Sequence, residues 1–132
     1  MAVSSANGSN TLHVLVDEDE ILVRDDIAHE LRDCGCTVLE ADTGEQAIAM
    51  CAAGVAVDVV FTDINLNGPS SGWDVAEAFR AARPATAVMY ASGNAIDRCR
   101  CVPGSLFFAK PYRLSDILDA CRHLPKNAAS FS

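Results

Sequence analysis

Four polar groups in this sequence each follow a short apolar segment, and their residue types suit acid and cation chemistry. Residues 17–20 are four consecutive acids, and Asp63, Ser92 and Lys110 follow three later segments. If the apolar segments are parallel strands, these side chains meet at the carboxyl edge of one sheet, where open α/β sheets bind ligands. Carboxylates crowded there repel one another unless a cation lies among them, and their oxygen atoms suit Mg²⁺.

This set of side chains meets the requirements of phosphoryl transfer to a carboxylate. A carboxylate beside Mg²⁺ can attack phosphorus and form an acyl phosphate, whose charged oxygens a metal ion, an ammonium and a hydroxyl group stabilise. We assign the transferred group to Asp63, because this residue ends the middle strand. Taken alone, each residue is ordinary, because acids favour helix starts and Asp and Ser favour turns. Their ordered occurrence at four strand ends favours an aspartyl-phosphate site.

Strand and helix patterns alternate along the chain and predict the scaffold of this site. We expect strands over residues 12–16, 36–41, 57–62, 86–91 and 105–109. The helices between them are expected to end before Gly35, Gly54 and Pro84, and the last helix spans Leu114 to Leu124. This order implies right-handed βαβ units in one doubly wound, five-stranded parallel α/β sheet with helices on both faces. The third strand hardly alternates, as expected for a strand covered on both sides.

The length and composition are those of one globular domain. The chain has 132 residues, of which 50% are hydrophobic, so one core suffices. We expect a disordered segment over residues 1–11, the folded domain over 12–124 and a tail over 125–132. No signal segment or bilayer-length apolar stretch is visible, so we expect a cytoplasmic protein that does not bind membranes.

The charge balance and the cysteines exclude other functions. Ten Lys and Arg residues against 18 Asp and Glu residues give a net charge of −8, and no basic run offers a nucleic acid its phosphate contacts. The pairs Cys34/Cys36 and Cys99/Cys101 are spaced too tightly for an ordinary zinc site. We therefore expect the six cysteines to be reduced and mostly buried.

Four segments together resemble the receiver domain of two-component response regulators. They are VLVDEDEILVRDDIAHEL (14–31), DVVFTDINLNGPSSGWDVAEAFR (58–80), AVMYASGN (87–94) and FFAKPYRLSDIL (107–118). The resemblance extends from about Leu12 to Leu124 and depends on the ordered combination of an acidic pair, an Asp, a Ser and a Lys-Pro. It implies a flavodoxin-like sheet with strand order 2-1-3-4-5.

The resemblance also implies a role for each matching acid. Glu18 and Asp19 would be the acidic pair that holds Mg²⁺, directly or through water. Asp63 would be the phosphorylated residue and a metal ligand. Asn65, two positions later, would give its backbone carbonyl to the metal.

The remaining matches concern the phosphoryl group and the signal. Ser92 would hydrogen-bond the phosphoryl group, and Lys110 would be its countercharge. The peptide bond from Lys110 to Pro111 is expected to be cis. Phosphorylation would draw Ser92 inward and shift the aromatic ring of Phe107. A histidine kinase or a His-containing phosphotransfer protein would donate the phosphoryl group.

The sequence departs from the family pattern in several places. Asp17 replaces an apolar strand residue and is expected to add a negative charge to the metal site, and Glu18 stands where many members have Asp. The loop after Asp63 is one residue longer than usual, and Phe107 lacks a hydroxyl group. Since only 18 positions separate Ser92 from Lys110, the fourth helix is expected to be shortened.

Three hypotheses for the function follow. The first is a stand-alone single-domain response regulator that accepts phosphate on Asp63 and signals by docking to a protein, without enzymatic turnover. The second is a phosphatase with an aspartyl nucleophile, which the lack of a second general acid close after Asp63 disfavours. The third is a pseudo-receiver that never takes phosphate, which Asp17 supports. The last helix or the shortened region would serve a homodimer, although an amphipathic stripe is more often core.

Overall fold

Strands and helices alternate throughout the part of the chain that the computed structural model describes, residues 11–93 and 100–124. In order they are β1 (His13–Asp17), α2 (Ile21–Asp33), β2 (Thr37–Ala41), α3 (Gly44–Ala52), β3 (Val59–Asp63), α4 (Gly72–Ala82), β4 (Ala87–Ser92), β5 (Leu106–Ala109) and α5 (Leu114–Arg122). The predicted N-terminal segment and tail, apart from residue 11, lie outside the described residues. So does most of the shortened fourth helix, since residues 94–99 are not described.

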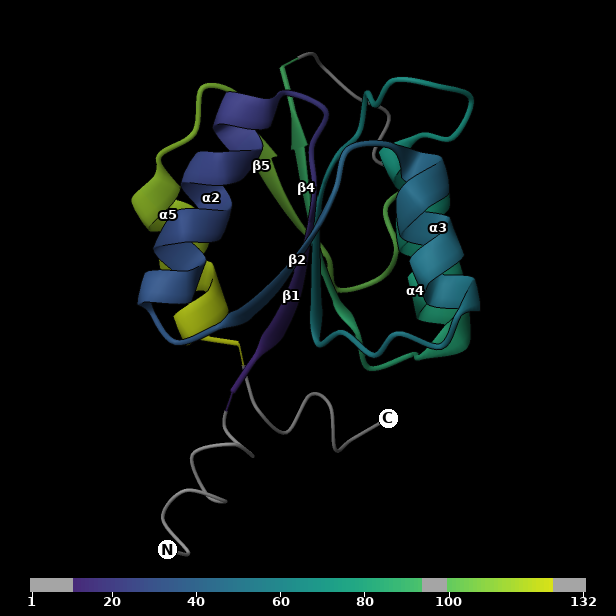
Figure 1. Ribbon diagram of the computed structural model, residues 1–132, viewed down its shortest axis with the longest axis horizontal. Helices are drawn as coiled ribbons and strands as arrows, with labels where there is room; N and C mark the ends of the chain where they lie inside the picture. Colours follow the sequence, from purple (N-terminus) through teal and green to yellow (C-terminus); the bar gives the residue numbers. More distant parts are fainter. Residues whose placement is uncertain (1–10, 94–99, 125–132) are drawn as a thin grey trace, which may run out of the picture.

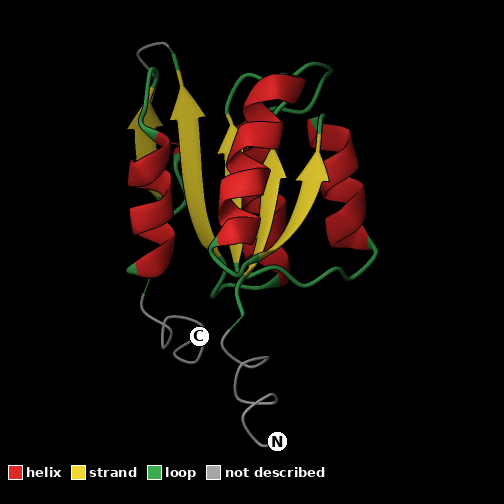
Figure 2. Cartoon of the chain, turned by 60° about the vertical axis from the view of Figure 1, so that its left-hand side comes forward, coloured by secondary structure: helices red, strands yellow, loops and turns green. Residues whose placement is uncertain are grey.

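The five strands form one parallel sheet in the order β2-β1-β3-β4-β5, which confirms the predicted topology. β3 lies at the centre, and all five of its residues are buried. The absence of alternation in its sequence therefore reflects cover on both faces. Figure 2 shows the five arrows running in the same direction, so that their carboxyl ends share one edge.

Two helices cover each face of the sheet (Figure 1). On one side α2 and α5 pack on β1 and β3, where Ile27 and Ile117 meet Val16 and Phe61. On the other side α3 and α4 enclose a second cluster, listed here by its buried members: Leu15, Ala41, Ala47, Val57, Val60, Val75 and Phe79. Consecutive residues of β1 thus belong to opposite layers, as strand geometry requires. The apolar stripe of α5 faces the first cluster, between α2 and the sheet.

Local signals explain where the helices begin and end. α2 ends before Gly35, whose φ of 93° suits a residue without a side chain. α3 begins after Thr43, whose hydroxyl accepts a hydrogen bond from the backbone N–H of Gln46 at 3.0 Å. α4 begins with a capping box between Ser71 and Asp74. The described helices include none long and apolar enough to cross a membrane.

Three strands end one residue later than predicted: β4 at Ser92, and β1 and β3 at two acids. β1 and β3 extend to Asp17 and Asp63, which the sequence pattern had placed after the strands. Both acids continue the ladder, since Asp17 pairs with Ala41 and Thr62, and Asp63 pairs with Ala91. The site acids are therefore held by the sheet rather than by loops.

Two smaller predictions have opposite outcomes. The peptide bond between Lys110 and Pro111 is cis, as expected. The expectation that the cysteines are mostly buried is wrong for those described: all five are free, but only Cys121 is buried and Cys34 is exposed. Both Cys34 and Cys36 lie in the connection from α2 to β2.

Candidate phosphoacceptor and cation site

The predicted site residues lie along the carboxyl edge of the sheet. Asp63 and Ser92 are the last residues of β3 and β4, and Lys110 directly follows β5. Glu18 directly follows β1, and its backbone N–H donates to the carbonyl oxygen of Ala41 at 3.0 Å. The fold thus brings residues separated by more than 90 positions to one edge.

Lys110 is paired with the predicted phosphoacceptor. Its Nζ atom donates to Oδ2 of Asp63 at 2.6 Å and lies 3.8 Å from Oε1 of Glu18. Burial is the largest influence on the pKa of Lys110 and lowers it, but the hydrogen bond and charge of Asp63, with the charge of Glu18, outweigh burial. The net pKa is raised, so the lysine is a fixed positive charge.

Three carboxylates converge beside this lysine. Glu18, Asp19 and Asp63 each offer an oxygen, and these atoms lie within 4.8 Å of one another. Glu18 is fully buried, and Asp63 is 4% exposed. Burial raises the pKa of Glu18 first, and the charge of Asp63 adds to it, whereas a hydrogen bond from the backbone N–H of Glu20 opposes the increase. The local excess of negative charge favours a bound cation.

The donor atoms fit Mg²⁺. All are carboxylate oxygens, the ligand type that Mg²⁺ prefers, and Asp19 is half-buried, which leaves room for water. Oε1 of Glu18 is buried and accepts no hydrogen bond from the described residues. An orphaned buried carboxylate oxygen is costly unless a cation approaches it. Glu18, Asp19 and Asp63 are therefore the residues that would hold the ion.

Of the other predicted site residues, Asn65 contacts Asp63, whereas Ser92 and Phe107 lie on β4 and β5. Ser92 is buried, and its backbone carbonyl accepts a hydrogen bond from the N–H of Lys110 at 2.8 Å. The backbone N–H of Asn65 donates to Oδ1 of Asp63 at 3.1 Å, so this residue lies beside the predicted phosphoacceptor. Phe107 is half-buried and packs against the cluster that contains Tyr90.

Asp17 is not one of the three converging carboxylates, although, besides burial, the charges of Glu18 and Asp19 contribute to its raised pKa. Its neighbour Leu15 faces α3 and α4, and alternation directs Asp17 to the same layer, whereas the converging group lies on the opposite side. It is fully buried, and neither carboxylate oxygen has a hydrogen-bond partner among the described residues. Burial first, then the charge of Asp42, raises the pKa of Asp17 to about 8.

The longer loop after Asp63 is fixed by α3. Oε2 of Glu45 accepts a hydrogen bond from the backbone N–H of Ser70 at 2.9 Å. At the end of the loop, Gly72 packs so closely on the backbone of Asp63 that a Cβ atom there would collide with the carbonyl oxygen of Asp63. The backbone on both sides of Asp63 is therefore tightly constrained.

Sequence reasoning missed two side chains at the site. Arg24 donates from Nη1 to the carbonyl oxygen of Glu18 at 2.7 Å. The hydroxyl of Tyr112 is buried without a hydrogen-bond partner among the described residues, and burial, followed by the charge of Glu18, raises its pKa to about 12. A cation four positions after the acidic run and an aromatic residue directly after Lys-Pro were the available signals.

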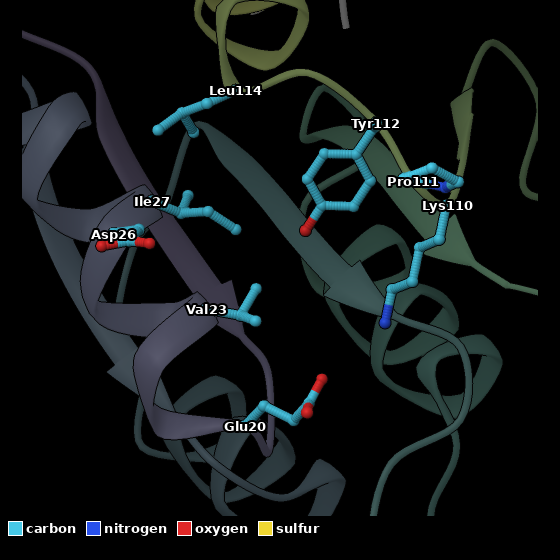
Figure 3. A pocket seen from close by; sticks show the side chains of 8 residues that line it. All are labelled: Glu20, Val23, Asp26, Ile27, Lys110, Pro111, Tyr112 and Leu114. Atoms are coloured by element: carbon cyan, nitrogen blue, oxygen red, sulfur yellow. The ribbon is translucent and has the colours of Figure 1, made fainter.

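A pocket opens beside Lys110, between α2 and the connection from β5 to α5 (Figure 3). Its volume is about 510 Å³. The lining residues are Glu20, Val23, Asp26, Ile27, Lys110, Pro111, Tyr112 and Leu114. Figure 3 shows the apolar side chains of α2 across from the ring of Tyr112. Lys110 thus belongs both to this pocket and to the group around Asp63.

Comparisons with known families and structures identify the family and agree with the fold. The family model of the response regulator receiver domain matches residues 14–122 of the sequence. A response regulator receiver protein from Sinorhizobium medicae WSM419 is similar in structure, with a TM-score of 0.79, 30% sequence identity and coverage of 92% of this chain and 94% of that chain. The receiver domain of the hybrid histidine kinase CckA has a TM-score of 0.71 and 27% identity, and the match covers 83% of this chain and 95% of that one.

Among curated proteins, the transcriptional regulatory protein PdtaR of Mycobacterium tuberculosis is 28% identical over 121 residues. The match covers 89% of this chain but 58% of PdtaR. The chain therefore spans a little over half the length of this relative.

Proposed function

Since the chain belongs to the response regulator receiver domain family of two-component signalling, we propose that it accepts a phosphoryl group on Asp63 and signals by docking to a protein. The observation that carries this proposal is the pairing of Asp63 with Lys110 at 2.6 Å, beside two further carboxylates. This arrangement supplies a nucleophile, a fixed positive charge and oxygen ligands for a cation within one small volume.

The proposed transfer uses the chain's own groups as follows. A carboxylate oxygen of Asp63 attacks phosphorus in a phosphohistidine, the P–N bond breaks, and the imidazole nitrogen keeps the electron pair and takes a proton. Lys110 neutralises the oxygens of the transferred group, and the hydroxyl of Ser92 donates a hydrogen bond to one of them. Glu18, Asp19 and Asp63 would hold Mg²⁺, which would supply further positive charge for these oxygens. Hydrolysis of the acyl phosphate reverses the state slowly.

A docking face for the phosphoryl donor adjoins this site. Ile21 and Leu22, at the start of α2, are 59% and 76% exposed. They are adjacent in sequence to Glu20 and Val23, which line the pocket beside Lys110. We propose that a sensor histidine kinase or a His-phosphotransfer protein in the cytoplasm binds here, because an apolar surface beside the nucleophile aligns donor and acceptor. The downstream target is a further protein.

Asp17 favours a second candidate, a binding module that never takes phosphate. A fully buried acid that has no hydrogen-bond partner in the described part of the chain departs from the packing that the strand otherwise shows. However, its side chain lies on the layer opposite the three converging carboxylates, so the geometry of Asp63 and Lys110 does not depend on it. We therefore prefer the phosphoacceptor function.

Incubation with phosphoramidate and Mg²⁺, followed by intact-mass analysis, tests the proposal. We expect one phosphoryl group per chain, none in EDTA, and none in Asp63→Asn. Asp58→Asn is the matched control, because Asp58 precedes the opposite end of β3 and its partners are His13 and Arg83. A phosphoryl label that survives Asp63→Asn would refute the assignment. Sustained release of phosphate from small esters would indicate a phosphatase. An unlabelled wild-type chain that binds no Mg²⁺ would indicate the binding module.

A further inference from the structure

Arg24 occupies a position that helix formation does not favour. It is the fourth residue of α2, which has no acid in its first turn. A cation at the start of a helix faces the positive end of the helix dipole, where acids are preferred. Nevertheless, only 13% of the side chain is exposed. The reason for an arginine at this point must therefore lie in its contacts with other elements.

These contacts join three parts of the site edge. Nη1 of Arg24 donates to the carbonyl oxygen of Glu18 at 2.7 Å, and Nε donates to Oε1 of Glu40 in β2 at 3.3 Å. The other oxygen of Glu40 accepts from Nη1 of Arg32 at 3.0 Å. Glu40 is therefore bonded to two guanidinium groups, and only that of Arg24 also reaches the acidic segment.

Three of the four hydrogen-bonding groups of Glu18 therefore have partners. Its N–H is bonded to Ala41, its carbonyl oxygen to Arg24, and its Oε2 to the N–H of Glu20 at 3.0 Å. Among the described residues Oε1 has no hydrogen-bond donor, and it faces Nζ of Lys110 at 3.8 Å. Arg24 thus brings a positive charge to the acidic segment without occupying a carboxylate oxygen.

We infer that Arg24 is a positioning residue for the cation site, which fixes the backbone of Glu18 and offsets the repulsion among the neighbouring carboxylates. The inference depends on the proposed function, because it assumes that Glu18, Asp19 and Asp63 bind Mg²⁺. A salt bridge that only stabilises the fold would connect Arg24 to Glu40 and leave the cation site unaffected. The two roles predict different effects on Mg²⁺ affinity.

Calorimetric titration of the full chain with Mg²⁺ alone distinguishes a positioning role of Arg24 from a purely structural one. We expect Arg24→Met to weaken Mg²⁺ binding by about 10-fold to 100-fold, the usual cost of losing a group that orients a metal ligand. Arg24→Lys keeps the charge but lacks the planar fork that reaches both Glu18 and Glu40, so we expect an intermediate loss. Arg32→Met is the matched control, because it removes the other bond to Glu40, together with a bond to the carbonyl oxygen of Val38, without touching Glu18.

The outcomes distinguish the inference from the function on which it depends. Wild-type binding, a loss in Arg24→Met and an unchanged affinity in Arg32→Met would support it. Wild-type affinity in Arg24→Met, or an equal loss in Arg32→Met, would overturn the positioning role and leave the proposed function intact. A wild-type chain that binds no Mg²⁺ would overturn both. Should Arg24→Met fail to fold in EDTA, the Arg24→Lys titration decides, since wild-type affinity there contradicts a role of the fork geometry.

Discussion

Nζ of Lys110 lies 2.6 Å from Oδ2 of Asp63, so the carboxylate proposed to accept phosphate is already paired with a cation before any phosphoryl group arrives. The lysine also lies 3.8 Å from Glu18. It therefore competes with a metal ion for the same negative charge, while the transferred phosphoryl group needs it as a countercharge. Removing Lys110 should affect these two processes in opposite directions.

Lys110→Met is expected to slow phosphorylation of Asp63 by about 100-fold, because one preorganised positive charge is lost from the transition state. In alkaline buffer, where the carboxylates are ionised, the same variant should bind Mg²⁺ about tenfold more tightly, since the competing ammonium is gone. Labelling rates with phosphoramidate and Mg²⁺ titrations measure the two effects. A parallel loss of both would show that Lys110 supports the cation site instead of competing with it.

Gly72→Ala should disturb the site without changing any polar group in it. A Cβ atom at position 72 would collide with the carbonyl oxygen of Asp63 and the Cα atom of Ile64. We expect a loss of about 1–3 kcal/mol of unfolding free energy, typical of overpacking, together with slower phosphorylation. Gly93→Ala is the control near the same site, because its Cβ would make only an ordinary contact with Lys110 at 3.9 Å. Equal denaturation midpoints for the two variants would contradict this packing.

Two tyrosines should respond differently to loss of the hydroxyl group. The hydroxyl oxygen of Tyr90 accepts a hydrogen bond from the buried N–H of Val102 at 3.1 Å, so Tyr90→Phe leaves that donor unsatisfied. We expect a cost of about 1–3 kcal/mol in urea denaturation. Tyr112→Phe removes a hydroxyl without a partner among the described residues, so we expect at most about 0.5 kcal/mol of change. A larger cost for Tyr112→Phe would reveal a bond to its hydroxyl group.

Asp17 should make the domain less stable as the pH rises. Burial raises its pKa from 3.8 to about 8, so the folded state retains a proton that the unfolded state releases. Stability from this proton is complete below pH 4 and is lost as the pH rises towards 8, by on the order of a few kcal/mol. Asp17→Asn cannot ionise, so in EDTA its thermal midpoint should exceed the wild-type value by an amount that grows over this range. A constant difference would mean that Asp17 ionises normally.

The fold could be predicted from the sequence because its signals are local and repeat. The uninterrupted apolar pattern of β3, the glycine that ends α2 and the Thr43 cap of α3 each correspond to the observed element. The ends of β1 and β3 could not be placed, because Asp17 and Asp63 are polar and only their pairing with adjacent strands shows that they continue the ladder.

The sequence predicted only those site residues whose position follows from the end of a strand. Four strand ends sufficed to propose that Glu18, Asp63 and Lys110 meet, and the structure places them together. The layer of Asp17 was available in principle, since alternation with Leu15 separates it from Glu18. The contacts of Arg24 could not be predicted, because they depend on the reach of one guanidinium group to a carbonyl oxygen and to a second strand.

The most direct test of the account is to locate the phosphoryl group. The chain is phosphorylated in Mg²⁺, the acyl phosphate is reduced with borohydride, and the peptides are mapped by mass spectrometry. Phosphorylation of Asp63 predicts that the reduced residue is position 63 and that Asp58→Asn gives the same map. Reduction at another acid, such as Asp17 or Glu18, or a phosphoryl group that resists borohydride, would contradict it.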